Sequence, residues 1–235
     1  MICTIDLHNH SCLSPCGSLE MSPSAMVKRA KHLGISVLGL SDHNSTRNLP
    51  AFDVCCTNQG IFPLCGIEVT TREEVHVTCY FETLKTAQHF GRFIESLLPD
   101  IPNSPDLLGD QVYVDSREHI LGEVEKSLGQ AADITFEQLL EEVHGLNGLF
   151  IPAHIDRPYF SVSSQLGFLP DLPYDAVESI RVPSALDTYQ NNVITNSDAH
   201  YLDGMGRRSW QIEISEYSFT AISAALESGN FRISQ

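Results

Sequence analysis

The chain of 235 residues lacks long hydrophobic runs. No segment approaches the ~20 consecutive apolar residues that a membrane-spanning helix needs, so we expect no membrane partner. The first residues also lack a basic stretch followed by an apolar one, which is the pattern of a secretory signal. These absences predict a cytoplasmic protein.

Positive charge is scarce as well. Lys and Arg number 14 against 30 Asp and Glu, which gives a net charge of -16. A field of that sign repels nucleic acids and anionic membranes, although bound divalent cations would reverse it locally. The sequence also lacks the basic patches with interleaved aromatic residues that are typical of nucleic-acid binding. These features disfavour a long nucleic acid as partner and favour a small phosphorylated substrate; the sequence carries no signal of oligomeric state.

The cysteines lack any Cys-x-x-Cys spacing, and their number, seven, is odd. This pattern predicts neither a disulfide framework nor a zinc knuckle. Cys55, Cys65 and Cys79 lie in apolar stretches, where a free thiol packs as a small hydrophobic side chain. Cys12 and Cys16 are different, because they lie in the loop just after a pair of histidines.

That pair, His8 and His10, follows a short apolar run that reads as a first strand. Side chains alternate along a strand, so both imidazoles project to the same side. Taken alone, the pair fits an ordinary polar loop equally well. It is supported by ligand-type residues within or after the later β-like runs 35–40, 61–69, 75–81, 149–151 and 193–195, namely His43, Glu68, His76, His154, Asp198 and His200. Such residues at the ends of successive strands predict a barrel with its site at one face.

Helical patterns alternate with these runs, which predicts a parallel sheet. We expect helices over 22–33, 51–58, 82–98, 135–143 and 218–228. The whole chain, 1–235, is predicted to be one domain. Residues of about 82–129 are interpreted as an insertion that could form a lid, with a short extended piece and a polar helix within 112–128.

The ten histidines fall into two classes. Four of them lie on or beside predicted helices without a partner motif and are interpreted as surface residues: His32, His89, His119 and His144. The other six, together with Glu68 and Asp198, outnumber the four ligands of one tetrahedral metal site. The count therefore predicts two or three divalent metal ions.

The motifs themselves resemble those of the PHP (polymerase and histidinol phosphatase) metallophosphoesterases. They are, in that family's order, Asp-Leu-His-Asn-His-Ser, Ser-Asp-His-Asn, an isolated Glu after an apolar strand, His-Ile-Asp-Arg-Pro and Asn-Ser-Asp-Ala-His. The resemblance extends from Asp6 to about His200. It implies an α/β fold, a distorted (β/α)7 barrel with zinc, manganese or iron ions at the C-terminal ends of the strands, and activity on phosphate esters.

The resemblance also implies a set of metal ligands. They are His8, His10 and Asp198 for a first ion, His76 and His154 for a second, Glu68 as a bridge, and His43 and His200 with one loop residue for a third. Many family members have Asp or His in that loop, where this chain has Cys16. A thiolate suits zinc or ferrous iron and is a poor ligand for manganese or magnesium. Either Cys16 is a ligand of unusual type, or the third site is weak.

The implied chemistry is hydrolysis by a bridging hydroxide, with Glu68 and Asp198 holding the ions and Arg157 gripping the substrate phosphate. A salt bridge to an acidic residue is the competing interpretation of Arg157. Asp6 and Asp42 either orient neighbouring imidazoles or make simple turn hydrogen bonds. Two other functions remain open, namely an exonuclease or oligonucleotide-trimming enzyme and a non-catalytic metal-binding regulatory domain. The complete set of eight principal ligands favours an enzyme.

Overall fold

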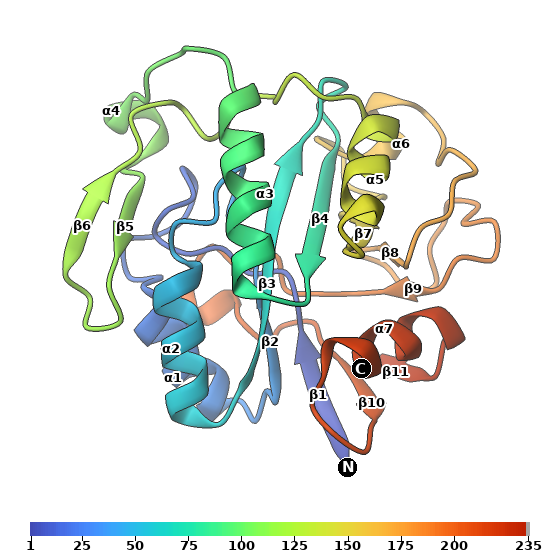
Figure 1. Cartoon of the computed structure of the whole chain (residues 1–235). Helices are drawn as coiled ribbons and strands as arrows, with labels where there is room; N and C mark the ends of the chain where they lie inside the picture. The colour runs from blue at the N-terminus through green and yellow to red at the C-terminus, as the bar shows by residue number, and fades with distance from the viewer. Residues whose placement is uncertain (234–235) are drawn as a thin grey trace.

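The computed structural model describes residues 1–233 and shows strands and helices following one another along the chain (Figure 1). The strands are β1 (Ile2–Asp6), β2 (Val37–Leu40), β3 (Phe62–Thr70), β4 (His76–Phe81), β5 (Val112–Val114), β6 (Ile120–Glu123), β7 (Leu149–Pro152), β8 (Val177–Glu178), β9 (Val193–Ile194), β10 (Trp210–Glu213) and β11 (Phe231–Ile233). The helices are α1 (Pro23–His32), α2 (Leu49–Gln59), α3 (Leu84–Leu97), α4 (Pro105–Leu108), α5 (Phe136–Gly145), α6 (Val162–Gln165), α7 (Phe219–Ser228) and the short 3-10 helix Leu202–Gly204.

Seven strands form one curled sheet in the order β11-β10-β1-β2-β3-β4-β7. Strands β1, β2 and β3 are parallel, so their carboxyl ends meet at one edge. The prediction of a fully parallel sheet is wrong for β4, which runs antiparallel to both of its neighbours. The reason is the tight connection between Thr70 and His76, which is too short for a crossover helix. As a result, β4 begins at the edge where the parallel strands end.

The small parallel pair β8-β9 closes the curl into a barrel. On one side, the Ile155 N–H that follows β7 donates to the carbonyl oxygen of Glu178 at 2.8 Å. On the other side, Asn9 and Ala199 form a parallel bridge beyond the ends of β1 and β9. Strands β1, β2, β3, β4, β7, β8 and β9 therefore surround the interior, while β10 and β11 extend the sheet outside it. The predicted distorted barrel is confirmed.

Two hydrophobic layers hold the barrel together. Helices α1, α2, α3 and α5 cover the outer face in Figure 1 and bury residues such as Met26, Phe52 and Phe90 against the sheet. The inner layer includes Tyr80, whose hydroxyl donates to the carbonyl oxygen of Leu7 across the barrel at 3.0 Å. The tyrosine ring lies directly over Gly66, where a Cβ atom would come within 2.4 Å of it.

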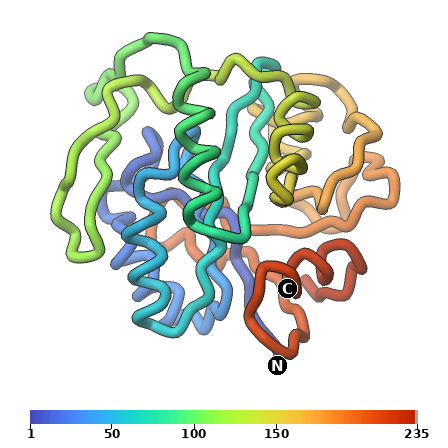
Figure 2. The backbone as a smooth tube through the Cα atoms, in the orientation of Figure 1, coloured from blue at the N-terminus to red at the C-terminus, as the bar shows by residue number. Residues whose placement is uncertain are grey.

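The segment predicted as an insertion, 82–129, has two structurally different parts. Its first part is α3, which buries Phe90 and Ile94 against the sheet. Its second part leaves the sheet and forms the hairpin β5-β6 at one side of the molecule (Figures 1 and 2). The polar helix expected within 112–128 is wrong, because the Asp115 carboxylate accepts two backbone N–H groups and closes a turn there. The extent of the single domain stays a prediction.

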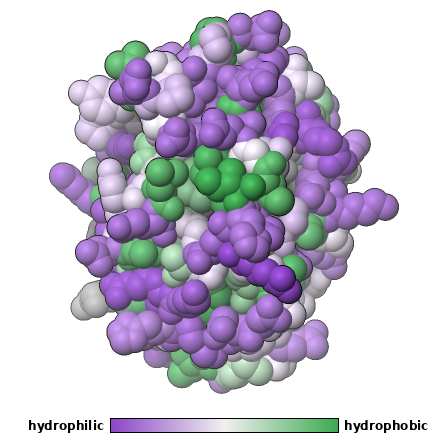
Figure 3. Space-filling view, turned by 90° about the vertical axis from the view of Figure 1, so that its left-hand side faces the viewer, coloured by the Kyte–Doolittle hydropathy of each residue, from purple (hydrophilic) through white to green (hydrophobic). Residues whose placement is uncertain are grey.

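The hairpin side of the molecule carries a band of hydrophobic side chains (Figure 3). The large apolar residues exposed within the segment 82–129 include Leu107, Ile120 and Leu121.

No helix within residues 1–233 is long and apolar enough to cross a membrane.

Candidate metal centre

Each of the seven barrel strands brings at least one ligand-type side chain to the same edge. These residues are His8 and His10 after β1, His43 after β2, Glu68 in β3, His76 at the start of β4, His154 after β7, Glu178 at the end of β8, and Asp198 and His200 after β9. Because β4 runs in the opposite direction, its first residue and not its last reaches this edge. The structure thus gathers all eight residues that the sequence singles out as principal ligands.

The Glu68 carboxylate lies at the middle of the cluster and is fully buried. Its Oε1 atom lies 3.2 Å from His8 Nε2, 3.1 Å from His76 Nδ1 and 3.2 Å from His154 Nε2, and its Oε2 atom lies 2.9 Å from His43 Nδ1 and 3.3 Å from His10 Nε2. Imidazoles therefore surround both oxygen atoms. This is the arrangement that a carboxylate shared between two cations requires.

The cluster contains three groups of potential ligands whose donor atoms all lie within 4.8 Å of one another. They are His8, His10 and Asp198; His43, Glu68 and His76; and His10, His43 and His200. Cys16 belongs to none of the three. It is exposed and lines the cavity above them, beside His43.

Several buried atoms of the cluster make no well-formed hydrogen bond, although some of them lie at contact distance from one another. They are Nδ1 of His43, His76 and His154, Oε2 of Glu68 and Oδ1 of Asp198. Burying a polar atom without a partner is costly, so such atoms are rare in folded proteins. More than one divalent cation would be needed to satisfy those atoms that face the centre, and a set of imidazoles and carboxylates suits zinc, manganese or iron. The residues present therefore fit bound metal ions.

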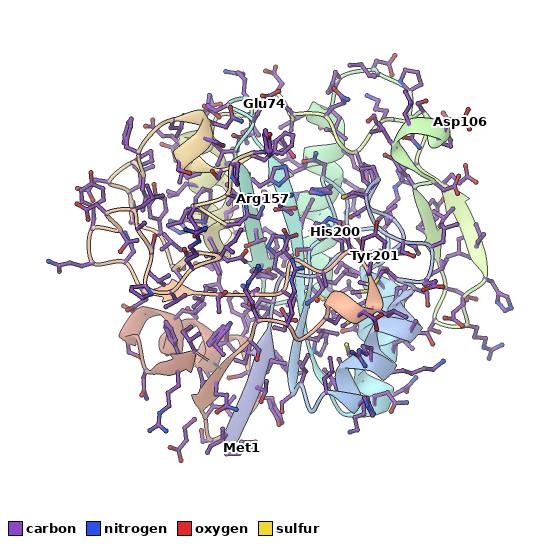
Figure 4. All side chains as sticks on the ribbon, turned by 180° about the vertical axis from the view of Figure 1, so that it is seen from behind. Met1, Glu74, Asp106, Arg157, His200 and Tyr201 are labelled. Carbon is purple, nitrogen blue, oxygen red and sulfur yellow. The ribbon has the colours of Figure 1, made fainter. Side chains whose placement is uncertain are left out.

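An open cavity of about 880 Å³ lies over the cluster. Figure 4 shows Arg157, His200 and Tyr201 close together on this side of the molecule, with Asp106 of α4 well away from them. No residue of 82–129 is among the described residues that line the cavity, so the hairpin does not act as its lid in this structure. Arg157 lines the cavity and also pairs through Nη1 with Asp198 Oδ2 at 2.8 Å.

A comparison with protein families identifies the architecture. The family model described as "PHP domain" matches residues 6–163. The chain belongs to the PHP family. Membership of this family supports the expectation of an enzyme, a metal-dependent phosphoesterase.

The chain is similar to one bacterial protein and to two solved structures. The uncharacterised protein YqxK of Bacillus subtilis (strain 168) is 26% identical over 233 residues, which cover 86% of this chain and 54% of YqxK. The lesion-specific endonuclease PfuEndoQ of Pyrococcus furiosus has a TM-score of 0.71 at 21% identity, over 99% of this chain and 58% of that chain. Endonuclease Q in complex with a 27-mer duplex has a TM-score of 0.69 at 20% identity, with the same coverage. The chain spans little more than half the length of each of these proteins.

Glu178 contacts the edge of the His8 ring that points away from Glu68, and it fixes the orientation of this ring. Both carboxylate oxygens lie 3.1 Å from His8 Nδ1, and Oε2 also accepts a hydrogen bond from Asn196 Nδ2 at 2.8 Å. The His8 Nδ1–H therefore donates to Glu178, which leaves the Nε2 lone pair for the centre. Sequence reasoning missed Glu178, and the only signal was a glutamate directly after the apolar residues Ala176 and Val177.

Ser14 performs the same task for His10. The serine hydroxyl donates to Asp42 Oδ1 at 2.8 Å and lies 3.0 Å from His10 Nδ1. Asp42 thus acts on the imidazole through Ser14 and does not accept its N–H directly. Asp6 makes the simpler contacts, because its carboxylate accepts the backbone N–H groups of Ser197 and Gly206. It holds the loop that leads to Asp198, and burial raises its pKa to about 6.

The backbone is strained at two cluster residues. His154 has a φ of 30° and Asp198 a φ of 49°, both in the left-handed region. Such conformations cost roughly 1–3 kcal/mol for residues other than glycine and persist where the surroundings enforce them. Both residues turn sharply after a strand, which directs their side chains toward Glu68 and His8.

The pKa values show how strongly the cluster is coupled. Burial alone would lower the pKa of His8, but the carboxylates of Glu178 and Glu68 outweigh burial and raise that pKa well above its ordinary value. Burial would raise the pKa of Glu68, but the surrounding histidines hold it well below the usual range. Burial lowers the pKa of His76 to about 4, so this imidazole is neutral at pH 7.

Proposed function

We propose that this PHP domain hydrolyses small phosphate esters with two or three divalent metal ions. The proposed ligands are His8, His10 and Asp198 for the first ion, His76 and His154 for the second, Glu68 between them, and His43 and His200 for a third. The observation that carries the proposal is the group of buried, unpaired ligand atoms around the Glu68 carboxylate. One ion cannot satisfy donors that surround both oxygens of this carboxylate.

The metal ions would lower the pKa of a water molecule and polarise the phosphoryl group. The chain itself contributes orientation and charge. Glu178 and Ser14 keep Nε2 of His8 and His10 directed at the Glu68 carboxylate. The charge of Glu68 would offset the repulsion between neighbouring cations. Arg157 lines the cavity with N–H groups that remain available beyond its Asp198 pair, so it is the proposed partner of a substrate phosphate.

The cavity supports a small substrate. Its volume of about 880 Å³ is enough for a phosphorylated metabolite or a nucleotide. Arg207 and Arg208 also line it, which adds positive charge at this site in a chain whose net charge is -16. A long polyanion would meet repulsion outside the cavity, whereas a small phosphoester fits within it.

A nuclease is the second candidate. It is favoured by the open cavity and by Tyr201, which is 65% exposed and lines this cavity together with Arg157 and Arg207. Exposed aromatic rings beside arginines can stack unpaired bases. Endonuclease Q, which shares the fold, was solved with an abasic lesion at its active site. A non-catalytic regulatory role is less favoured, because the cluster retains every principal ligand.

Activity on a panel of phosphomonoesters, nucleotides, short oligonucleotides and long DNA or RNA separates these candidates. We expect hydrolysis of one or more small phosphoesters, abolished by a chelator and lost in Asp198→Ala. The exposed histidine variant His89→Ala, on the outer side of α3, is the matched control and should keep full activity. Cleavage of long nucleic acid with no activity on any small phosphoester would establish the nuclease instead.

A further inference from the structure

The loop after His10 is fixed at both ends to the metal centre. At its start, the Ser14 hydroxyl accepts the backbone N–H of His43 at 3.1 Å. At its end, the Ser18 N–H donates to the carbonyl oxygen of His200 at 2.9 Å. Gly17 allows the tight turn between them, because a Cβ atom there would lie 2.3 Å from the Ser11 carbonyl oxygen. The loop therefore spans the gap between the His43 and His200 sides of the centre.

Cys16 lies in the middle of this loop. It is the exposed cysteine of the chain, whereas the other six are buried. It lines the same cavity as His43 and His200. Its Sγ atom lies outside the compact ligand groups. An exposed side chain changes rotamer within picoseconds to nanoseconds, so the thiol can turn further inward without moving the fixed loop.

The histidines on this side lack a complete ligand set. His43 is only 8% exposed, and its Nδ1 atom faces Glu68 Oε2 at 2.9 Å, which leaves its Nε2 atom for this side. His10, His43 and His200 form a compact group, but His10 also belongs to the group of His8 and Asp198. If His10 is a ligand of the first ion, only the imidazoles of His43 and His200 remain as ligands for a third ion. A zinc site with one open position needs three protein ligands.

We propose that the Cys16 thiolate is the third protein ligand of this position, with His43 and His200, and that it makes the position selective for zinc or ferrous iron. The inference rests on the proposed function, since it assigns a ligand within the same centre. A thiolate binds these borderline-soft ions well and manganese or magnesium poorly. Cys16, His43 and His200 all line the cavity, so a phosphoryl oxygen of the substrate would reach an ion at this position from the cavity.

Cobalt substitution tests the sulfur ligand directly. Wild-type protein loaded with Co²⁺ should show a thiolate-to-cobalt charge-transfer band in the near ultraviolet. The band should disappear in Cys16→Ser, and elemental analysis should find one ion fewer per chain. Cys55→Ser, which changes a buried thiol on α2, is the control and should keep both the band and the ion. A band of unchanged intensity in Cys16→Ser would overturn the assignment.

Alkylation of the wild type provides a second readout, which does not depend on a variant folding well. In the wild type, zinc should slow iodoacetamide labelling of Cys16 by at least about tenfold relative to chelated protein, because the bound thiolate is no longer free to react. Cys16→Asp should shift the preference of one ion position toward manganese. Equal labelling with and without zinc would contradict the inference.

The outcomes also separate this inference from the proposed function. Two bound ions and phosphoester hydrolysis without any Cys16 effect would refute only the sulfur ligand. A wild-type protein that binds no ion would refute the metal-dependent function itself.

Discussion

The two sides of the metal centre differ in burial and in support. On the Glu68 side, His8, His10 and His154 are fully buried, and carboxylate or hydroxyl groups hold the first two from behind. On the other side, His200 is half-buried, Cys16 is exposed, and both line the open cavity. The difference predicts that ions bind more tightly on the Glu68 side, and that the open side exchanges its ion more readily and meets the substrate.

Glu68→Ala should cause the largest loss of activity and of metal affinity. It removes the carboxylate around which both buried ligand groups are arranged, so both ions should lose affinity. We expect a loss of activity well beyond the roughly 10–100-fold typical of removing a group behind a ligand. His43→Ala, which removes a ligand of the open side, should cost less. Kinetics and metal content of the two variants, with thermal melting to confirm folding, check the order; equal losses would contradict it.

Glu178→Gln should have the next largest effect. Glutamine is close in size but lacks the charge that holds the His8 Nδ1–H, so metal affinity should fall by roughly 10–100-fold. Titration of the metal-free protein with zinc measures this loss. Glu141→Gln, an exposed change on α5, is the control and should bind zinc as the wild type does. Unchanged affinity in Glu178→Gln would show that His8 needs no support.

Metal binding should release protons at pH 7. Burial alone would lower the pKa of His43, but Glu68 outweighs it and raises that pKa to about 9 in the metal-free protein. The imidazole is therefore protonated at neutral pH and must lose its proton to bind a metal. Affinity should rise as the pH increases from 6 to 9. Calorimetry in two buffers of different ionisation enthalpy measures the release, and identical heats in both buffers would contradict the assignment.

The smallest effect is expected far from the centre. Leu121 is 61% exposed on the β5-β6 hairpin, which does not line the cavity. Leu121→Ser should change stability by no more than about 0.5 kcal/mol and leave kcat and KM unaltered. A marked rise in KM would revive the idea that this segment covers the substrate.

Much of the centre could be predicted from the sequence, because its ligands recur at the ends of recognisable strands. His8, His43 and His154 each follow an apolar run long enough to identify. Glu178 was missed because its strand has two residues, too few for any alternation to show. The sequence pattern also missed the reversal of β4, since a strand reads alike in both directions. Closure of the barrel depends on hydrogen bonds between distant loops, such as Asn9 with Ala199, that no local pattern encodes.

Anomalous diffraction from crystals of the zinc-loaded protein tests the central claim most directly. The account predicts two strong peaks beside the Glu68 carboxylate, one near His8, His10 and Asp198 and the other near His76 and His154, and a third near Cys16, His43 and His200. A single peak, or peaks away from Glu68, would contradict it.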